Sequence, residues 1–297
     1  MSIFYLLWLL VYCYTINMYL LTFLFVFLLG TIIGSFLNVV IYRFNTGRTI
    51  TKGRSICMSC NRNLRWYELI PVLSFLIQSG KCRRCTSKIS HQYPLVELVT
   101  GLVFALIAFK FLPVLYFSYW AYIFFVVLFV FIFSLLIVIS VYDLRHKIIP
   151  DKLVFVFIII SFLSIFINSN GFGHIFTLPT FSALASGPIL ALPFVLLWFF
   201  SKGRLMGLGD GKLVLGIGWM LGISSGLFAI ILSFWLGTII SVIIMLLSKG
   251  LPALKWEQAG KMNMKTEIPF APFLIISALV TFLFSFNIFS LIKLFSI

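Results

Sequence analysis

Two aspartates, Asp143 and Asp210, carry the strongest chemical signal in this sequence. The chain has only three aspartates, and the third is Asp151. Asp143 ends a long apolar run in the stretch VYDLRHKIIPD, and Asp210 precedes another in MGLGDGK. A carboxylate at the depth of a membrane is costly to desolvate, so such residues face the protein interior or water and are candidates for a functional site.

Two carboxylates held close together cannot both ionise, so they share one proton. The ionised carboxylate can draw a proton from a water molecule that attacks a peptide carbonyl, while the protonated one donates to the developing oxyanion. Such a pair titrates as a unit rather than as two independent acids. Asp143 and Asp210 therefore predict an aspartic peptidase that works without a covalent intermediate.

The residues around Asp210 are candidates for supporting this site. Gly207 and Gly209 leave the backbone bare, which allows an extended substrate strand to approach closely. Lys212 either interacts with the pair or the substrate, or simply marks the cytoplasmic side, which is the default interpretation. Asp210 itself has a structural alternative, because Asp is a favoured residue at helix N-termini.

Asp143 and Asp151 lie at opposite ends of the loop that joins two apolar runs. Asp143 falls at the C-terminal end of a predicted helix, where the helix macrodipole disfavours a carboxylate, so it needs another reason to be there. Asp151 follows Pro150 at the start of the next helix and either caps that helix or aids the site, with capping as the favoured interpretation.

The segment before these spans holds two Cys-x-x-Cys pairs. They are Cys57 with Cys60 in CMSC and Cys82 with Cys85 in CRRC. This spacing is typical of a zinc site with four thiolate ligands, and a cytoplasmic location argues against disulfides. Because four thiolates leave no open coordination position, we expect a structural zinc ion that replaces a hydrophobic core in a small insert.

The composition is that of a polytopic membrane protein, with 62% hydrophobic and 10% charged residues and a mean hydropathy of +1.16. The sequence therefore predicts an all-α fold in the lipid bilayer. The first 42 residues carry no charged side chain, so no cleavable signal peptide is expected. The apolar runs predict eight transmembrane helices, near residues 18–42, 94–112, 118–142, 152–168, 178–200, 211–222, 225–247 and 268–294.

The net charge of +15 comes from Lys and Arg in short segments between these runs. Four segments, 43–92, 143–152, 201–212 and 249–265, hold twenty of the 22 basic residues. Eight spans place all four segments on one side, and the positive-inside rule makes that side cytoplasmic, with both termini outside. The charge thus indicates membrane orientation, and no nucleic-acid partner is expected.

This organisation divides the chain into three parts. Residues 1–42 form an N-terminal extension and the first transmembrane helix, and residues 1–17 within them are expected to be either an extension or an upstream mis-start that is not translated. Residues 43–92 form a small Cys-rich cytoplasmic insert, and residues 93–297 form a transmembrane bundle that carries the aspartates.

Seven stretches in order resemble the type IV prepilin peptidases, also called leader peptidase/N-methyltransferases. They are GTIIGSFLNVVIYR (30–43), the double Cys-x-x-Cys, WYELIPVLSFL (66–76), SHQYPLVELVTG (90–101), DLRHKIIPD (143–151), MGLGDGKL (206–213) and IPFAPFL (268–274). The resemblance covers nearly the whole chain from about residue 30, and residues 1–17 depart from the usual start of the family.

The resemblance implies an endopeptidase that removes the basic leader of type IV prepilins and pseudopilins, the substrates of type IV pilus and type II secretion systems. It would act at the cytoplasmic face of the bacterial inner membrane. By motif, the family's catalytic aspartates correspond to Asp143 and Asp210.

Many members also methylate the new N-terminal amine with S-adenosylmethionine, a step associated with the amino-terminal part and its insert. Here Gly34, Asn38, Arg43, Glu97 and the four cysteines are all present. No Gly-rich nucleotide-binding loop of the soluble type is visible, so methylation rests on the resemblance and the residues that bind its cofactor are not identified by the sequence.

Three alternatives remain open at this stage. Tyr142-Asp143 with Gly207-Leu208-Gly209-Asp210 also resembles the presenilin and signal-peptide-peptidase group, although a Cys-rich insert has no place there. A proton-coupled transporter would use the aspartates as a relay, but both are expected at one membrane face rather than near the midplane. A zinc-bearing structural membrane protein would use neither aspartate for catalysis.

Overall fold

The computed structural model describes residues 2–47, 49, 53–167, 178–250 and 269–288, with side chains from residue 20 onward and up to residue 246 in the helix that ends at Gly250. Within these residues the fold is helical, with isolated β-bridges between Ile56 and Asn63 and between Lys81 and Lys88. Most of the basic segment at 249–265 and the loop at 168–174 lie outside the described residues.

The chain divides into two compact units, Met1–Ser134 and Leu135–Ile297. The boundary falls inside helix α4 (Tyr119–His146). Helix α3 (Gln92–Leu115) packs against α1 (Ser2–Arg43) within the first unit. The division into an N-terminal part, an insert and a bundle near residues 42 and 92 stays a prediction.

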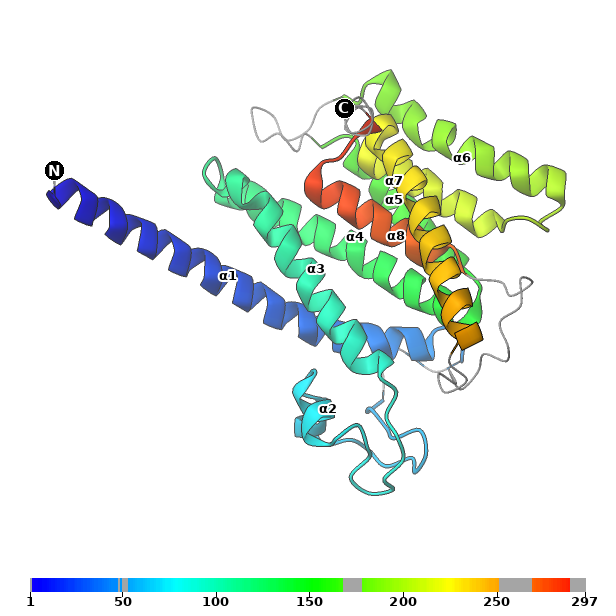
Figure 1. Cartoon of the computed structure of the whole chain (residues 1–297), viewed down its shortest axis with the longest axis horizontal. Coiled ribbons are helices and arrows are strands. Elements are labelled where there is room, and N and C mark those ends of the chain that lie inside the picture. The colour runs from blue at the N-terminus through cyan, green and yellow to red at the C-terminus, as the bar shows by residue number, and fades with distance from the viewer. Residues whose placement is uncertain (1, 48, 50–52, 168–177, 251–268, 289–297) are drawn as a thin grey trace. The chain divides into compact units, whose positions relative to one another are not determined.

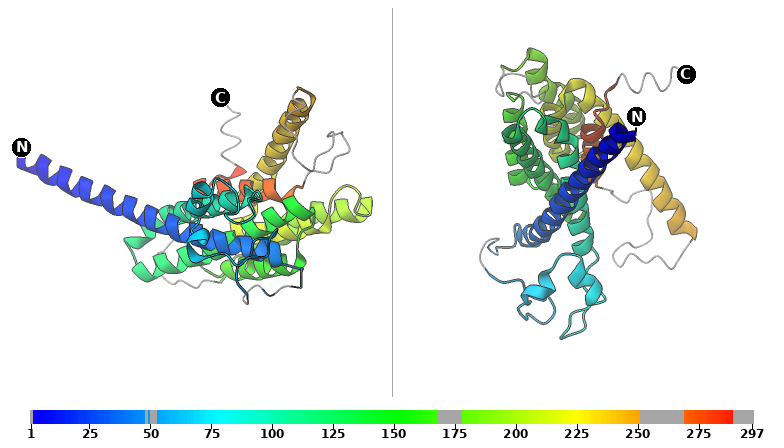
Figure 2. Two further views of the ribbon diagram at one scale, coloured as in Figure 1. Left: turned by 90° about the horizontal axis from the view of Figure 1, so that it is seen from below. Right: turned by 90° about the vertical axis from the view of Figure 1, so that its left-hand side faces the viewer.

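The first unit consists of α1, the small insert, α3 and the first part of α4. The insert contains the 3-10 helix η1 (Trp66–Leu69) and the short helix α2 (Leu73–Ile77). Figure 1 shows the insert in cyan where α1 ends and α3 begins, and Figure 2 shows the same placement from two other sides.

The helices α1 and α3 pair through residues repeated every four positions on each helix. A Cβ atom on Gly30 would lie 2.7 Å from the Cα of Gly101, and one on Gly34 would lie 2.8 Å from the Cα of Glu97. One turn further along α1, the Asn38 amide group donates to the Tyr93 carbonyl at 3.1 Å. Small residues at i and i+4 let two membrane helices approach closely, which explains the sequence GTIIGSFLN in α1.

The second unit contains the rest of α4 with α5 (Asp151–Ser164), α6 (Phe181–Ser201), α7 (Leu208–Gly250) and α8 (Ala271–Phe284). The first part of α7 packs between α5 and α6. A Cβ on Gly216 would lie 2.4 Å from the Phe157 ring, and one on Gly218 would lie 2.8 Å from the Cα of Gly187. These glycines bring the start of α7 tightly into its bundle.

Helix α7 consists of two limbs that fold back on each other at Gly222, which has φ 79° and ψ 176°. A Cβ on Gly226 would lie 3.7 Å from the Cα of Gly218. Eight residues of straight helix would separate these positions by about 12 Å, so the chain reverses between them. Figure 1 shows the yellow first limb and the orange second limb. The sequence interpretation of two spans, near 211–222 and 225–247, is thereby confirmed.

Five of the described helices are long and apolar enough to cross a membrane, and α7 with its two limbs is among them. α5 and α8 are shorter apolar helices of 14 residues each. Many large apolar side chains are exposed along the long helices, among them Leu24, Phe25 and Phe36 on α1. Such apolar surface is suited to lipid rather than water, and the protein is a multi-pass, all-helical membrane protein.

Candidate functional site

Asp143 lies in the last turn of α4 and its residue is only 4% exposed. Its carboxylate accepts a hydrogen bond from the backbone amide of Ala271, the first residue of α8. A helix N-terminus presents unpaired N–H groups and a partial positive charge, which together stabilise an anion. Asp143 thus lies at the C-terminal end of α4, which disfavours a carboxylate, but its carboxylate accepts a hydrogen bond from the N-terminal end of α8, which favours one.

Asp210 lies in the first turn of α7 and accepts a hydrogen bond from the backbone amide of Gly207. It interacts electrostatically with Asp143, so the fold brings the two carboxylates near each other from different helices. Both belong to the second unit. The two residues that the sequence selects as a pair are therefore neighbours in space.

The two candidate glycines beside Asp210 have different surroundings. A Cβ on Gly207 would meet little besides the Asp210 carboxylate, whose Oδ2 would lie at 3.5 Å. A Cβ on Gly209 would lie 2.9 Å from the Cβ of Ile149, which is closer than side chains approach. Gly207 therefore leaves open space next to the carboxylate, whereas Gly209 makes room for the loop that precedes α5.

Asp151 and Lys212 form an ion pair with a distance of 2.7 Å between Asp151 Oδ1 and Lys212 Nζ. Asp151 is the first residue of α5, and the N-cap position is occupied by Pro150. The Lys212 ammonium also lies 5.7 Å from the centre of the Phe155 ring. The pair thus links the start of α5 to the first turns of α7, the helix that carries Asp210.

The sulfur atoms of Cys57, Cys60, Cys82 and Cys85 all lie within 4.8 Å of one another. The Sγ atoms of Cys57 and Cys85 are 3.8 Å apart. A tetrahedron with zinc–sulfur bonds of about 2.3 Å has edges of about 3.8 Å. The donor set and its spacing fit a four-thiolate zinc site, so four cysteines from two separate loops can bind a metal ion such as zinc.

The two Cys-x-x-Cys loops share one backbone design. The Cys57 amide donates to the Arg62 carbonyl and the Cys82 amide donates to the Ser87 carbonyl, both at 2.9 Å. The residue after each second cysteine, Asn61 or Thr86, has a positive φ. Each loop is therefore a tight turn that presents its two sulfur atoms on the same side, as metal-binding knuckles require.

The thiols of this cluster differ in pKa because their sulfur atoms have different surroundings. Burial raises the pKa of Cys57, but the backbone amides of Cys60 and Ser59 outweigh it and lower the pKa to about 6. The Ser87 hydroxyl and amide lower the pKa of Cys85. The Arg62 amide lowers the pKa of Cys60, yet burial and the neighbouring thiols raise it to about 11. Thiolates are the metal-binding form, so the lowered pKa values of Cys57 and Cys85 favour metal binding.

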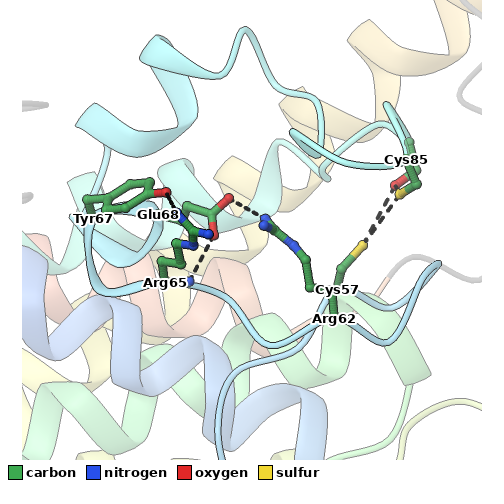
Figure 3. A network of polar contacts seen from close by, with 7 residues as sticks. Cys57, Arg62, Arg65, Tyr67, Glu68 and Cys85 are labelled. Atoms are coloured by element: carbon green, nitrogen blue, oxygen red, sulfur yellow. Dashed lines mark hydrogen bonds and ion pairs between the residues drawn. The ribbon is translucent and has the colours of Figure 1, made fainter.

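A buried carboxylate joins the first knuckle to η1. Glu68 is 6% exposed, and its two oxygens accept from the Arg62 guanidinium at 2.5 Å and from the Arg65 amide at 2.8 Å. The Arg65 guanidinium donates to the Tyr67 hydroxyl at 3.1 Å. Figure 3 shows Glu68 between the two arginines, with the Cys57 and Cys85 sulfur atoms beyond Arg62. The network ties the metal-binding loop to the rest of the insert.

The first unit contains a cavity of about 390 Å³ between α1, the insert and the start of α3. Its wall includes Asn38 and Tyr42 from α1, Tyr93 and Glu97 from α3, and both knuckles. Tyr42 and Tyr93 stack with ring centres 4.8 Å apart and planes 5° apart. Cavities of this size, with aromatic walls and a few polar groups, are typical of small-molecule sites.

The sequence interpretation identified no residues for a cofactor, and the cavity supplies candidates for that role. The buried acid of VELVTG, Glu97, was the signal available in the sequence, because a Glu within an apolar run needs a reason to be there. The 2.7 Å hydrogen bond that its Oε2 accepts from the Val72 amide is not visible in the sequence.

Two family models match the chain. The bacterial peptidase A24 N-terminal domain matches residues 28–111, and the type IV leader peptidase family matches residues 130–242. The first match contains the cavity and the cysteines, and the second contains Asp143 and Asp210. The cavity with the cysteines and the pair of aspartates therefore lie in regions that different family models match.

Several relatives carry the name prepilin leader peptidase/N-methyltransferase. The protein from Bacillus subtilis is 30% identical over 264 residues, which cover 89% of this chain and 95% of that protein. The protein from Neisseria gonorrhoeae is 30% identical over 75% of this chain and 82% of its own length. The protein from Myxococcus xanthus is 52% identical over 80 residues, 27% of this chain and 24% of that protein.

No solved structure matches the chain at a significant level. The relatives from Bacillus subtilis and Neisseria gonorrhoeae nevertheless align with most of both chains. This chain belongs to the type IV leader peptidase family.

Proposed function

We propose that this protein removes the leader from type IV prepilins or pseudopilins and that Asp143 and Asp210 perform the cleavage. The observation that carries the proposal is the proximity of these two carboxylates at the ends of α4 and α7, in the unit that the peptidase family model matches. The positive-inside rule assigns their membrane face to the cytoplasm of a bacterial inner membrane, where a basic leader would be found.

The pair acts as one acid–base unit. One carboxylate is ionised and takes a proton from the attacking water, while the other is protonated and donates to the carbonyl oxygen of the scissile peptide bond. The Ala271 and Gly207 amides orient the two carboxylates. Negative charge is shared between them, so the protonation states belong to the pair and not to either residue.

The surroundings of Asp210 support access of a peptide strand. Gly207 leaves open space beside the carboxylate, which suits the backbone of an extended substrate. The Asp151–Lys212 ion pair holds the starts of α5 and α7 together next to this space. Since Asp151 has a side chain that is 63% exposed, the pair is screened by solvent and contributes less than about 1 kcal/mol to stability.

We assign a second activity, methylation of the new N-terminal amine, to the first unit. S-Adenosylmethionine supplies a methyl group on a positively charged sulfur, which leaves as a neutral thioether with the electron pair of the broken carbon–sulfur bond. The cavity fits such a molecule, because Asn38 is one of its lining residues and carries a buried Oδ1 atom that has no hydrogen-bond partner in the described part of the chain. Tyr42 and Tyr93 offer aromatic faces to a flat or cationic group.

The tetra-Cys site supports this cavity rather than the chemistry itself. Cys57 and Cys82 line the cavity, as do Met58, Ser59 and Ser87 from the same loops. A zinc ion held by four thiolates fixes both loops and therefore one wall of the cavity. The metal is structural because all four positions of a tetrahedral site are filled by sulfur.

Co-expression with a prepilin from the same genome tests both activities. The mature pilin is purified and its N-terminus is measured by mass spectrometry. We expect loss of the leader and a single added methyl group on the new N-terminal residue. An intact prepilin would contradict the peptidase function, and a cleaved but unmethylated product would contradict the second activity alone.

A further inference from the structure

The cavity of the first unit holds a buried carboxylate that no described cation neutralises. Glu97 is 7% exposed and lines the cavity from the first turns of α3. Its Oε2 accepts from the Val72 amide at 2.7 Å, and the Ser35 side chain donates to the same carboxyl group. Among the described residues, the ion pairs formed by glutamate involve Glu68 and none involves Glu97.

Glu68 provides the comparison within the same cavity wall. It is equally buried, but Arg62 forms an ion pair with it. A buried charge without a cation is strongly destabilising, and proteins keep such charges where they bind something. The difference between the two glutamates indicates that the cation for Glu97 comes from a ligand.

A second acceptor lies on the facing helix. Asn38 is 1% exposed, and its amide nitrogen donates to the Tyr93 carbonyl at 3.1 Å. Asn38 is among the residues that line the cavity, and its buried Oδ1 has no hydrogen-bond partner in the described part of the chain. Gly34, one turn before Asn38 on α1, packs against the Cα of Glu97. Glu97 and Asn38 thus line the same cavity from paired helices, and a carboxylate with an unpaired amide oxygen fits a group with several N–H donors.

The backbone that donates to Glu97 is itself strained. Val72 has φ 60° and ψ −52°, and the Leu73 amide donates to the Pro71 carbonyl across it at 2.5 Å. This is a γ-turn of the rare form with positive φ, and a β-branched residue is especially unfavourable there. Strain of this kind persists where the surrounding structure imposes it, often at functional sites. Here it aims the Val72 amide at Glu97 and fixes the carboxylate.

We propose that Glu97 and Asn38 bind the N-terminal ammonium of the cleaved substrate and that Glu97 accepts its proton. The inference rests on the methylation assigned above to this cavity. An α-ammonium has a pKa of about 7.7–8.0, so at neutral pH the amine must lose a proton before its nitrogen has a free electron pair. The proton passes to Glu97, the nitrogen forms its new bond to the methyl carbon, and the product is a protonated secondary amine.

The other titratable or charged groups that line the cavity do not replace Glu97. Besides two of the cysteines, they are Tyr42, Arg43, Glu68, Lys88 and Tyr93. Arg43 and Lys88 are cationic and would repel an ammonium, and Glu68 is bound to Arg62. The tyrosines offer ring faces that favour a cation but hold no negative charge at neutral pH.

Peptide binding in the absence of any methyl donor tests this role directly. The full-length protein in lipid nanodiscs is titrated with a synthetic peptide that begins at the first residue of the mature prepilin, and with the same peptide acetylated at its N-terminus. At pH 6.5 we expect the wild type to prefer the free amine by about tenfold or more, as charge-assisted hydrogen bonds allow. Glu97→Gln keeps the acceptor for Val72 but loses the charge, so the preference should disappear.

Glu97→Asp serves as the conservative variant, since it keeps the charge on a shorter side chain and should retain part of the preference. Leader removal by the same preparations reports whether the second unit of each variant is folded, and the unfolding temperature of the first unit reports whether the part that carries Glu97 is folded. A Glu97→Gln protein that still prefers the free amine as strongly as the wild type would overturn the proposal. If both Glu97 variants lose the preference for the free amine and also lose leader removal, Asn38→Asp, which adds a charge at the neighbouring acceptor, decides the outcome. A preference that Asn38→Asp retains would show that the two Glu97 variants are misfolded. Loss of the preference in Asn38→Asp as well would mean that the proposal is wrong.

A pH profile separates a proton acceptor from a merely structural residue. Methylation of the free-amine peptide by Glu97→Gln should rise about tenfold per pH unit up to pH near 8, because solvent then removes the proton, whereas the wild type should change much less. A parallel shift of both profiles would contradict the proposal. Failure of wild-type protein to bind S-adenosylmethionine would instead contradict the cavity's assigned activity, and the donor-free peptide titration still decides the role of Glu97.

Discussion

The Cα atom of Glu97 packs directly against Gly34, so close that a Cβ atom on Gly34 would lie only 2.8 Å from it. The close approach places α1 and α3 side by side along the stretch that carries Asn38, Tyr93 and Glu97. The cavity therefore depends on Gly34, a residue that has no side chain and does not line the cavity.

Gly34→Ala should force α1 and α3 apart. Overpacking of this kind costs about 1–3 kcal/mol, and we expect a lower unfolding temperature for the first unit and at least a severalfold loss of affinity for S-adenosylmethionine, measured by calorimetry. Ile32→Ala is the control, because Ile32 is 57% exposed on the same part of α1. Wild-type affinity and stability in Gly34→Ala would show that the helices are not in contact as described.

Gly209→Ala and Gly211→Ala form a matched pair beside Asp210. A Cβ on Gly209 would lie 2.9 Å from the Cβ of Ile149, whereas one on Gly211 would lie at an ordinary 3.5 Å from Phe194. We expect Gly209→Ala to slow leader removal by about fivefold or more, as a strain of about 1–3 kcal/mol implies, and Gly211→Ala to remain within about threefold of the wild type. Kinetics on a purified prepilin measure both. Equal effects of the two substitutions would remove the packing explanation.

Acidification should weaken the insert through Glu68. Burial raises the pKa of Glu68, but the Arg65 amide and the Arg62 guanidinium outweigh it and hold the pKa below its usual value. A carboxyl group whose pKa is lower in the folded than in the unfolded protein stabilises the fold. This stabilisation is complete above the pKa of the unfolded state, about 4.3, and is lost as the pH falls through the pKa of the folded state.

The comparison with Glu68→Gln isolates this contribution, because other acid-sensitive groups act equally in both proteins. Hydrogen exchange of residues 55–90 should show a constant stability difference between the two proteins above about pH 5 and a shrinking one below about pH 4.3. A difference that grows on acidification would mean that Glu68 is not held as an ion pair with Arg62.

Removal of the metal should damage the cavity more than the peptidase. The knuckles that hold Cys57 and Cys82 line the cavity, and both aspartates belong to the other unit. After treatment with a strong zinc chelator, we expect at least about a tenfold loss of affinity for S-adenosylmethionine because structural zinc contributes directly to folding. Metal content is measured by elemental mass spectrometry, and restored zinc should recover binding. Full affinity in metal-free protein would contradict a structural role.

The continuous apolar runs predicted most of the fold, because a membrane helix must satisfy its own backbone hydrogen bonds. The predicted spans near 211–222 and 225–247 even correspond to the two limbs of α7, on either side of the reversal at Gly222. The Cys-x-x-Cys spacing likewise predicted the sulfur cluster, because the geometry of each knuckle is local.

Contacts between distant segments were not predictable in the same way. The strained turn at Val72, the hydrogen bond from it to Glu97 and the pairing of Asp151 with Lys212 all depend on how separate elements pack. The sequence interpretation treated Gly209 as room for substrate, and the structure adds that Ile149 lies against it. The roles of the aspartates stay a prediction, although the fold brings the two together.

Substitution of each aspartate by its isosteric amide is the most direct test of the central claim. Asp143→Asn and Asp210→Asn are assayed for release of the leader from purified prepilin, with methylation of an already cleaved peptide as the test of folding and Asp151→Asn as the neighbouring control. We predict that leader release falls by at least about 10³-fold in both variants, that methylation persists, and that Asp151→Asn stays within about tenfold of the wild type. Leader release near the wild-type rate in either Asp143→Asn or Asp210→Asn would contradict the account.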